Sequence, residues 1–349
     1  MKQPFVNQKP ISHGDYLALR YLMKVSDGGK VAKAQSFRVF DKAYREGRLS
    51  VTDVGESQEQ RWWRCEARFL HGYYEDWSGW ECRDPWAYRV WFDNPFPVPV
   101  WTGDKVDRLY VVSEQGLGDE VLFLQALERV YESAKEIIVE TQPRLQSIVE
   151  RNFRCRTVPA KIRDDGMRVK QDFEADAWVT IGEICRTFLR SRDDFKRRPY
   201  LKADPARVSE YRSLAGRVGI SWRGRQGEEK RLIDLFPDAI SLQYDQEWDE
   251  EVERPDVDLK NDLEGVLGVL ANLSKLVTVS TTVAHLASAM GIETHVIVAD
   301  PKTGRFGGLI PWKWVNEKMP GRSIWYSDAT STYKGLEDYA KVWKLRLRF

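Results

Sequence analysis

The chain has 349 residues, of which 42% are hydrophobic and 31% charged, and its formal net charge at pH 7 is +1. This length allows two to three domains, and a charge near zero gives no overall electrostatic footprint for nucleic acid. Because no run of about 18 apolar residues could span a bilayer and the first residues lack the apolar core of a signal peptide, we expect a cytoplasmic protein without membrane insertion. The four cysteines lack metal-ligand spacing and are expected to be reduced thiols. They are Cys65, Cys82, Cys155 and Cys185.

Residues 1–104 differ from the rest of the chain. Helical spacing of apolar residues at 16–22, 34–44 and 61–80 predicts a small helical module, and prolines at positions 95, 97 and 99 predict an extended linker. The segment is rich in tryptophan, with Trp62, Trp63, Trp77, Trp80, Trp86, Trp91 and Trp101. These side chains either form core and interdomain contacts or build a surface on which an acceptor stacks.

From residue 105 the pattern changes to alternating strand and helix. Expected strands lie at 109–113, 136–140, 177–182, 219–222, 239–243, 276–280 and 295–299, and expected helices fill 117–134 and 143–153. This alternation is typical of parallel sheets, whose ligands bind beyond the carboxyl ends of the strands. We therefore predict an α/β protein with two Rossmann-like halves, at 105–205 and 206–330, and a final helix within 331–349 that packs across them.

The first candidate corner between a strand and a helix is the run VSEQGLGDE at 112–120. Gly116 and Gly118 allow a tight turn and close approach to a ligand. Asp119 falls on the first turn of the helix, where it is either a catalytic base or an N-cap. The dinucleotide-binding fingerprint would place its third glycine at the position of Val121, so a dehydrogenase is disfavoured.

The second corner follows the strand at 276–280, where Ser280, Thr281 and Thr282 open a helix that Gly291 closes. Free N–H groups and the helix dipole favour an anion at such a start, and a diphosphate would suit it. The alternative is an ordinary Ser/Thr cap on a helix that has His285 packed in the core one turn further on.

Six motifs occur in this chain in the same order as in a known family. They are EQGLGD at 114–119 and VAHLA at 283–287, with FPVPVWTG at 96–103, PYLKAD at 199–204, VGISWRG at 218–224 and SLQ at 241–243. From about residue 70 onward the chain resembles the bacterial and phage glycosyltransferases that are often fused to tetratricopeptide repeats. These are relatives of the heptosyltransferases and, more distantly, of the O-GlcNAc transferases. The resemblance implies a GT-B fold and the transfer of a sugar from a nucleotide sugar to an acceptor hydroxyl, with inversion.

The resemblance also implies roles for residues of both corners and of the strands between them. Asp119 would be the catalytic base. The donor and its phosphates would be held by Gly116, Gly118, Ser221, Arg223, Arg231, Gln243, Tyr244, Ser280, Thr281, Thr282 and His285. Ser280 stands where an acid is usual in the family, and Tyr244 stands where a lysine is common. No metal or cofactor is expected besides the nucleotide-sugar co-substrate, because the acidic run at 256–258 is interpreted as a loop and cap.

Three functions are open at this point. The first is a glycosyltransferase that acts on a glycan or protein, and the second is a phage enzyme that glycosylates hydroxymethylated bases of DNA in the host cytoplasm. The third is a degenerate member that binds nucleotide or glycan without turnover. The second is motivated by the basic residues Arg186, Arg190, Arg192, Lys196, Arg197 and Arg198, which a solvated basic surface also explains. The departures at Ser280 and Tyr244 motivate the third.

Overall fold

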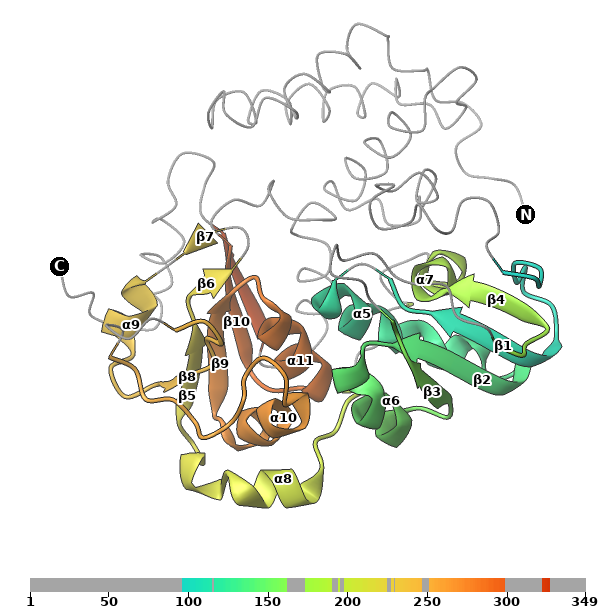
Figure 1. Ribbon diagram of the computed structural model, residues 1–349. Helices are drawn as coiled ribbons and strands as arrows, with labels where there is room; N and C mark the ends of the chain where they lie inside the picture. The colour runs from blue at the N-terminus through green and yellow to red at the C-terminus, as the bar shows by residue number, and fades with distance from the viewer. Residues whose placement is uncertain are drawn as a thin grey trace, which may run out of the picture.

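The computed structural model describes residues 96–114, 116–161, 173–189, 194, 198–224, 227–228, 230–246, 251–298 and 322–326, which are coloured in Figure 1. Most of the expected helical module, including six of its tryptophans, lies outside the described residues. The expected C-terminal helix at 333–347 also lies outside them.

The first sheet is wholly parallel, with the strand order β3-β2-β1-β4. Its strands are β1 (Val106–Val112), β2 (Ala134–Thr141), β3 (Arg156–Pro159) and β4 (Ala177–Thr180). The helical segments of this part are α5 (Leu117–Phe123), η3 (Leu124–Val130), η4 (Pro143–Leu145), α6 (Gln146–Asn152) and α7 (Ile181–Phe188).

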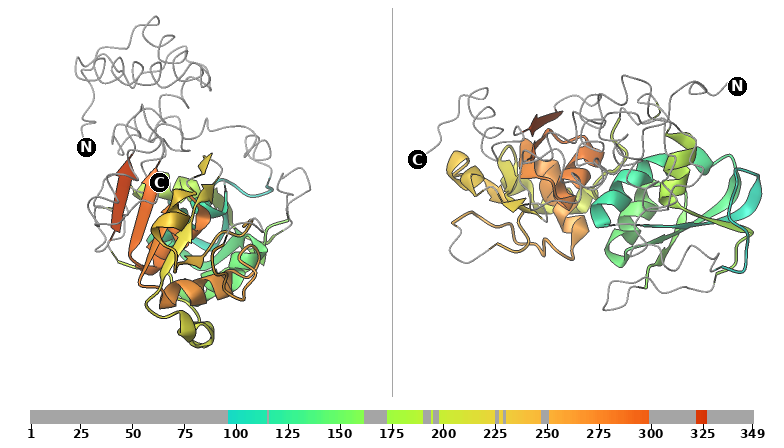
Figure 2. Two further views of the ribbon diagram at one scale, coloured as in Figure 1. Left: turned by 90° about the vertical axis from the view of Figure 1, so that its left-hand side faces the viewer. Right: turned by 90° about the horizontal axis from the view of Figure 1, so that it is seen from above.

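The second sheet is also parallel, with the strand order β11-β10-β9-β5-β8. Its strands are β5 (Val218–Ser221), β8 (Ile240–Ser241), β9 (Lys275–Val279), β10 (Thr294–Val298) and β11 (Arg322–Tyr326). A small antiparallel hairpin is formed by β6 (Arg223–Gly224) and β7 (Gly227–Glu228). The helical segments are α8 (Pro205–Glu210), η6 (Arg212–Leu214), α9 (Arg231–Leu235), α10 (Leu263–Asn272) and α11 (Thr282–Met290). The prediction of an α/β protein with parallel sheets is confirmed, and the two sheets lie side by side in Figure 1 and in the right-hand view of Figure 2.

Alternation along the central strand explains why the first sheet is covered on both faces. Successive side chains of a strand point to opposite faces, so Leu109 and Val111 join one apolar cluster while Tyr110 and Val112 join another. All four are almost completely buried. A strand that is apolar on both faces is typical of a parallel sheet between two covering layers.

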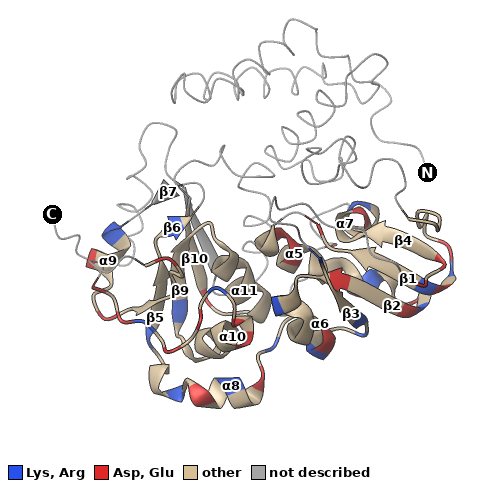
Figure 3. Ribbon diagram, in the orientation of Figure 1, with Lys and Arg blue, Asp and Glu red and all other residues tan. Residues whose placement is uncertain are grey.

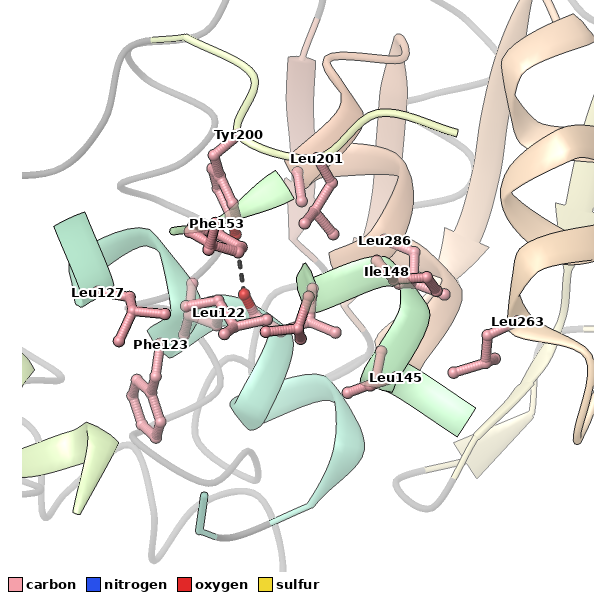
Figure 4. Close-up of a cluster of buried hydrophobic side chains, with 14 of the residues drawn as sticks. Leu122, Phe123, Leu127, Leu145, Ile148, Phe153, Tyr200, Leu201, Leu263 and Leu286 are labelled. Atoms are coloured by element: carbon pink, nitrogen blue, oxygen red, sulfur yellow. Dashed lines mark hydrogen bonds between the residues drawn. The ribbon is translucent and has the colours of Figure 1, made fainter. Parts of the chain in front are cut away.

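One buried cluster continues from the first sheet's helices to those of the second. Leu145 and Ile148 of the first part and Leu263 and Leu286 of the second belong to it (Figure 4). The crossing segment before α8 strengthens this contact, because Tyr200 donates its N–H to Ala289 O at 2.9 Å and its hydroxyl to Val121 O at 3.2 Å. α5 and α11 are therefore tied to the same tyrosine.

A second set of contacts joins α6 to α10. The Arg151 guanidinium binds both carboxylate oxygens of Glu264, at 2.7 and 2.6 Å, and Ser147 donates to the same carboxylate at 2.6 Å. Such a bidentate pair is geometrically specific as well as attractive. The two sheets thus share an apolar core and a polar contact at its rim.

Three expectations need correction. The strand expected at 177–182 ends at Thr180, because this side chain accepts from Glu183 N at 3.3 Å and begins α7. The helix expected to 134 is α-helical only to Phe123 and continues as 3-10 helix. The expected linker pairs with the edge of β4, since Pro99 O accepts from Trp178 N at 3.0 Å and Trp101 N donates back to Trp178 O at 2.8 Å.

Candidate functional site

Asp119 lies at the start of α5, where its carboxylate folds back onto the preceding loop. Asp119 Oδ2 accepts a hydrogen bond from Gly116 N at 3.1 Å, and Gly116 is the N-cap residue of the helix. Asp119 is therefore not the N-cap itself, as the alternative interpretation had it, but the third residue of the helix, whose carboxylate binds the backbone of the N-cap residue. The same bond fixes the direction of a partly buried carboxylate, so a cap and a base are compatible roles for it.

The start of α11 differs from those of three other helices. Thr180, Asp204 and Asp262 each accept a hydrogen bond from the first turn of α7, α8 and α10, respectively. Thr281, the N-cap of α11, makes no such side-chain bond, and its hydroxyl lies 3.2 Å from the Thr278 hydroxyl. The helix ends as expected at Gly291, which adopts the left-handed conformation with φ of 79°.

The hairpin after β5 lies directly against this second corner. A Cβ atom at Gly224 would lie 3.0 Å from Ser280 O and 3.2 Å from Thr281 Cγ2. Glycine therefore allows the hairpin backbone to approach the start of α11 more closely than another residue would. Gly224 was not among the expected site residues. Its place directly after a strand, in the run Trp222-Arg223-Gly224, could have indicated a close approach of the backbone at this point.

Gln243 supports the backbone of the β5–β6 turn. Its side chain is buried, and its Oε1 accepts from Ser221 Oγ at 3.0 Å, Trp222 N at 3.1 Å and Arg223 N at 2.9 Å. Its Nε2 donates to Asp245 Oδ1. The carboxamide thus holds the turn that carries Arg223, whose guanidinium donates to Asp245 O at 2.9 Å.

Two further expected site residues lie at the outer part of the second sheet. The Tyr244 side chain is 55% exposed. Arg231 begins α9, which lies on the side of the second sheet away from α5 in Figure 1 and in the right-hand view of Figure 2. The structure therefore separates Arg231 from the corner that carries Asp119.

The two corners meet through Gly118 and His285. A Cβ atom at position 118 would lie 2.7 Å from His285 Cδ2 and 3.3 Å from its Nε2, so only glycine fits beside the ring without movement of a neighbour. Burial lowers the pKa of His285 to about 3, which leaves the imidazole neutral at physiological pH. His285 lies one turn into α11 as expected, but it is half-buried rather than part of the core, and its neighbour is the first corner.

The acidic run at 256–258 forms a loop, as expected. Asp258 Oδ1 accepts from Lys260 N at 2.9 Å and Asn261 N at 3.0 Å, and its Oδ2 accepts from the Asn261 side chain at 2.8 Å. These bonds lower the pKa of Asp258, and the bond from the Asn261 side chain has the largest effect. Among the residues that the structure describes, no group of three or more His, Cys, Asp or Glu side chains could hold a metal ion.

A cavity of about 450 Å³ lies elsewhere, on the face of the first sheet that carries Tyr110 and Ile138. Arg108 and Arg156 line it near the amino ends of their strands, and they pair with Glu174 and Glu136. Ligands of parallel sheets bind beyond the opposite, carboxyl ends. This cavity is therefore separate from the two corners.

The basic cluster expected around 186–198 is only partly described. Arg186 pairs with Glu183 at 3.0 Å, and four of the six residues lie outside the described ranges. Basic and acidic positions alternate over the described ribbon (Figure 3). In the described part of the chain, no helix is long and apolar enough to cross a membrane.

Comparison with known proteins gives similarities of low identity. No family model matches the chain. Protein FlbA of Caulobacter vibrioides is 24% identical over 283 residues, which cover 67% of this chain and 48% of that protein. The chain thus spans about half the length of the curated relative it matches.

Several solved structures have a similar backbone. One is a glycosyl transferase family 9 protein from Veillonella parvula, with a TM-score of 0.45 and 9% identity, and the match covers 71% of this chain and 94% of that chain. E. coli ADP-heptose LPS heptosyltransferase II has a TM-score of 0.43, 12% identity and coverage of 67% and 98%. E. coli heptosyltransferase WaaC, solved with ADP, has a TM-score of 0.42, 12% identity and coverage of 67% and 97%.

Proposed function

We propose that this chain is a glycosyltransferase that moves a sugar from a nucleotide-sugar donor to an acceptor hydroxyl, with inversion and without a metal ion. The observation that carries the proposal is the contact between Gly118 and His285. It joins two strand-to-helix corners that are far apart in the sequence and that each resemble a motif of one glycosyltransferase family. One corner offers a carboxylate, and the other offers a helix start suited to phosphate.

Asp119 would act as the general base. As the acceptor oxygen attacks the anomeric carbon, its proton passes to the Asp119 carboxylate, the new C–O bond forms, and the bond to the diphosphate oxygen breaks with its electron pair. Attack from the side opposite the leaving group inverts the anomeric centre. General base catalysis typically contributes about 10² to 10⁴ in rate.

The leaving diphosphate would be stabilised at the start of α11. Backbone N–H groups of the first turn and the hydroxyls of Thr281 and Thr282 can donate to it, and the helix dipole favours its charge. The Arg223 side chain on the neighbouring hairpin is a candidate cation for this diphosphate, because arginine binds phosphate in a bidentate manner. Ser280 in place of an acid and Tyr244 in place of a lysine leave the identity of the sugar and nucleotide undefined.

In this proposal the two sheets are the Rossmann-like halves of a GT-B enzyme. The half at 105–205 and the segment 1–104 would hold the acceptor, and the half at 206–330 would hold the nucleotide sugar. The placement of Asp119 on the first half and of Thr281 on the second supports this division.

A thermal-shift screen of nucleoside diphosphates and nucleotide sugars, followed by a transfer assay with the best donor, tests the proposal. A ligand at about 100 times its Kd should stabilise the chain by about 2.7 kcal/mol. Thr281→Glu places a negative charge at the start of α11, so it should abolish this shift while the ligand-free melting temperature stays close to that of the wild type.

The outcomes separate the alternatives. Binding without hydrolysis or transfer would identify a degenerate nucleotide-binding protein. Transfer to hydroxymethylated DNA, with duplex affinity that falls steeply with salt, would identify the DNA-modifying enzyme. Absence of binding to every nucleotide would exclude a glycosyltransferase.

A further inference from the structure

Glu114 is a buried carboxylate at the carboxyl end of β1. Only 2% of the residue is exposed, and its Oε1 accepts a hydrogen bond from Gly182 N at 2.7 Å. Gly182 is the second residue of α7, which follows β4 directly. Because β1 and β4 are neighbours in the first sheet, the glutamate joins the ends of two adjacent strands.

The bond to Gly182 explains how a charge is tolerated at this depth. A buried carboxylate is strongly unfavourable unless hydrogen bonds compensate it, and an N–H at the positive end of a helix is a favourable partner. Thr180 covers the next amide, that of Glu183, at 3.3 Å. The start of α7 is thus satisfied from within the protein, in contrast to the start of α11, where Thr281 makes no capping bond.

The loop that begins at Glu114 is held on both sides of β1. On one side Ser113 N donates to Glu140 O of β2 at 3.0 Å, and on the other the Glu114 side chain reaches α7. The same loop contains Gly116, whose N–H fixes the Asp119 carboxylate at 3.1 Å. An anchor at Glu114 therefore acts on the residue that holds Asp119.

A buried thiol lies near this carboxylate. The pKa of Cys185 is raised well above its usual value, mainly by burial and to a lesser extent by the negative charge of Glu114. The thiol consequently stays protonated and adds no second negative charge beside the anchor.

We propose that Glu114 is a positioning residue, which holds the loop between β1 and α5 against the start of α7 and thereby sets the place of the Asp119 carboxylate. Its part in transfer rests on the function proposed above. Its structural effect on the loop is measurable without any donor or acceptor.

The decisive variant is Glu114→Ala, which removes the oxygen that accepts from Gly182 N. We expect kcat for transfer to fall by about 10²-fold, since a displacement of about 1 Å can cost that much, while the Kd for the nucleoside diphosphate at α11 stays within twofold. Glu140→Ala is the matched control, because Glu140 is also buried and its carboxylate instead accepts from the Tyr110 hydroxyl at 2.8 Å. Its kcat should stay within twofold of the wild type. Equal kcat values for the two variants would overturn the proposal.

Amide hydrogen exchange of peptides that cover residues 114–123 provides the second readout. Protection in this segment should fall at least tenfold in Glu114→Ala relative to Glu140→Ala, whereas Glu114→Gln, which keeps an acceptor oxygen for Gly182 N, should retain most of it. Unchanged protection in Glu114→Ala would refute the anchoring role, whatever the activity. If the wild type binds no nucleotide, the function proposed above fails, and the exchange experiment still decides the role of Glu114.

Discussion

At the scale of single residues, Asp119 combines a structural bond with the position expected of a base. Its carboxylate accepts from Gly116 N, so a substitution that removed this acceptor would change the loop and the chemistry together. Asparagine keeps an acceptor oxygen that can take the same bond from Gly116 N but removes the charge of the base. It therefore separates the two roles.

We expect Asp119→Asn to lower kcat for transfer by about two orders of magnitude or more, with the melting temperature and the nucleotide Kd nearly unchanged. Steady-state kinetics and calorimetric titration of the same preparation measure both quantities. Wild-type kcat in this variant would reduce Asp119 to a cap and require a different base.

His285 leads to a prediction about pH. Burial lowers its pKa to about 3 in the folded chain, whereas an unfolded imidazole titrates near 6.5. Above pH 6.5 both states are neutral and the residue has no effect on stability. Below it the unfolded chain binds the proton more readily, so the folded state loses at most about 1.4 kcal/mol per pH unit until the pH reaches about 3.

Urea unfolding at pH 7, 6 and 5 measures this effect. The wild type should lose more stability on acidification than His285→Asn, which has no imidazole at this position. Because His295 and the carboxylates are the same in both proteins, their contributions cancel in the difference. Parallel pH dependences would show that the folded chain accepts a proton on His285 at ordinary pH.

At the scale of elements, the contact of α5 with α11 depends on the missing side chain of Gly118. Alanine there would place its Cβ 2.7 Å from the His285 ring, and overpacking of this kind costs about 1 to 3 kcal/mol. Within a helix, however, alanine is favoured over glycine by up to about 1 kcal/mol. Whether Gly118→Ala lowers or raises the free energy of unfolding should therefore depend on His285.

A double-mutant cycle by urea unfolding checks this dependence. Gly118→Ala should destabilise the wild type but be neutral or stabilising in the His285→Ala background, which leaves a coupling energy of at least about 1 kcal/mol. Additive effects would mean that the ring moves aside without cost and that the two corners are not in obligatory contact.

The elements themselves could largely be predicted from the sequence. Runs of β-branched and apolar residues located most strands of both sheets, and Gly291 marked the end of α11. The expected strand end at residue 182 was wrong because the apolar run continues past Thr180. The local cap by Thr180 begins α7 there, and the bond between Glu114 and Gly182 that accompanies it joins residues far apart in the chain. β11 was missed because its five residues are ordinary and its pairing with β10 is also long-range.

The candidate site could be predicted only in its parts. Each corner was visible as glycines or hydroxyl residues between a strand and a helix. Their meeting at Gly118 and His285, and the approach of Gly224 to Ser280, depend on how the two sheets pack, about which local patterns carry no information. Gln243 shows the same limit, since its three bonds to the β5–β6 turn follow from the pairing of strands β5 and β8.

At the scale of the whole molecule, the continuous cluster from Leu145 to Leu286 implies that the two sheets open together. We expect slowly exchanging amides of β1 and β9 to share one opening free energy in native-state hydrogen exchange. Arg151→Ala, which removes the bidentate contact with Glu264, should lower both values equally. Two distinct opening free energies in the wild type would show that the sheets are independent cooperative units. A decrease confined to one sheet in Arg151→Ala would show the same.

The segment from Pro199 to Leu201 has a consequence for engineering. Tyr200 and Leu201 both donate their N–H groups to Ala289 O, and a side chain on Gly291 would clash with Pro199 Cγ. A chimera that replaces only residues 206–330 would therefore keep a 199–201 segment that is shaped for the original α11. If the second half holds the nucleotide sugar as proposed, a transplant of its specificity should exchange α5, the segment 199–201 and α11 together.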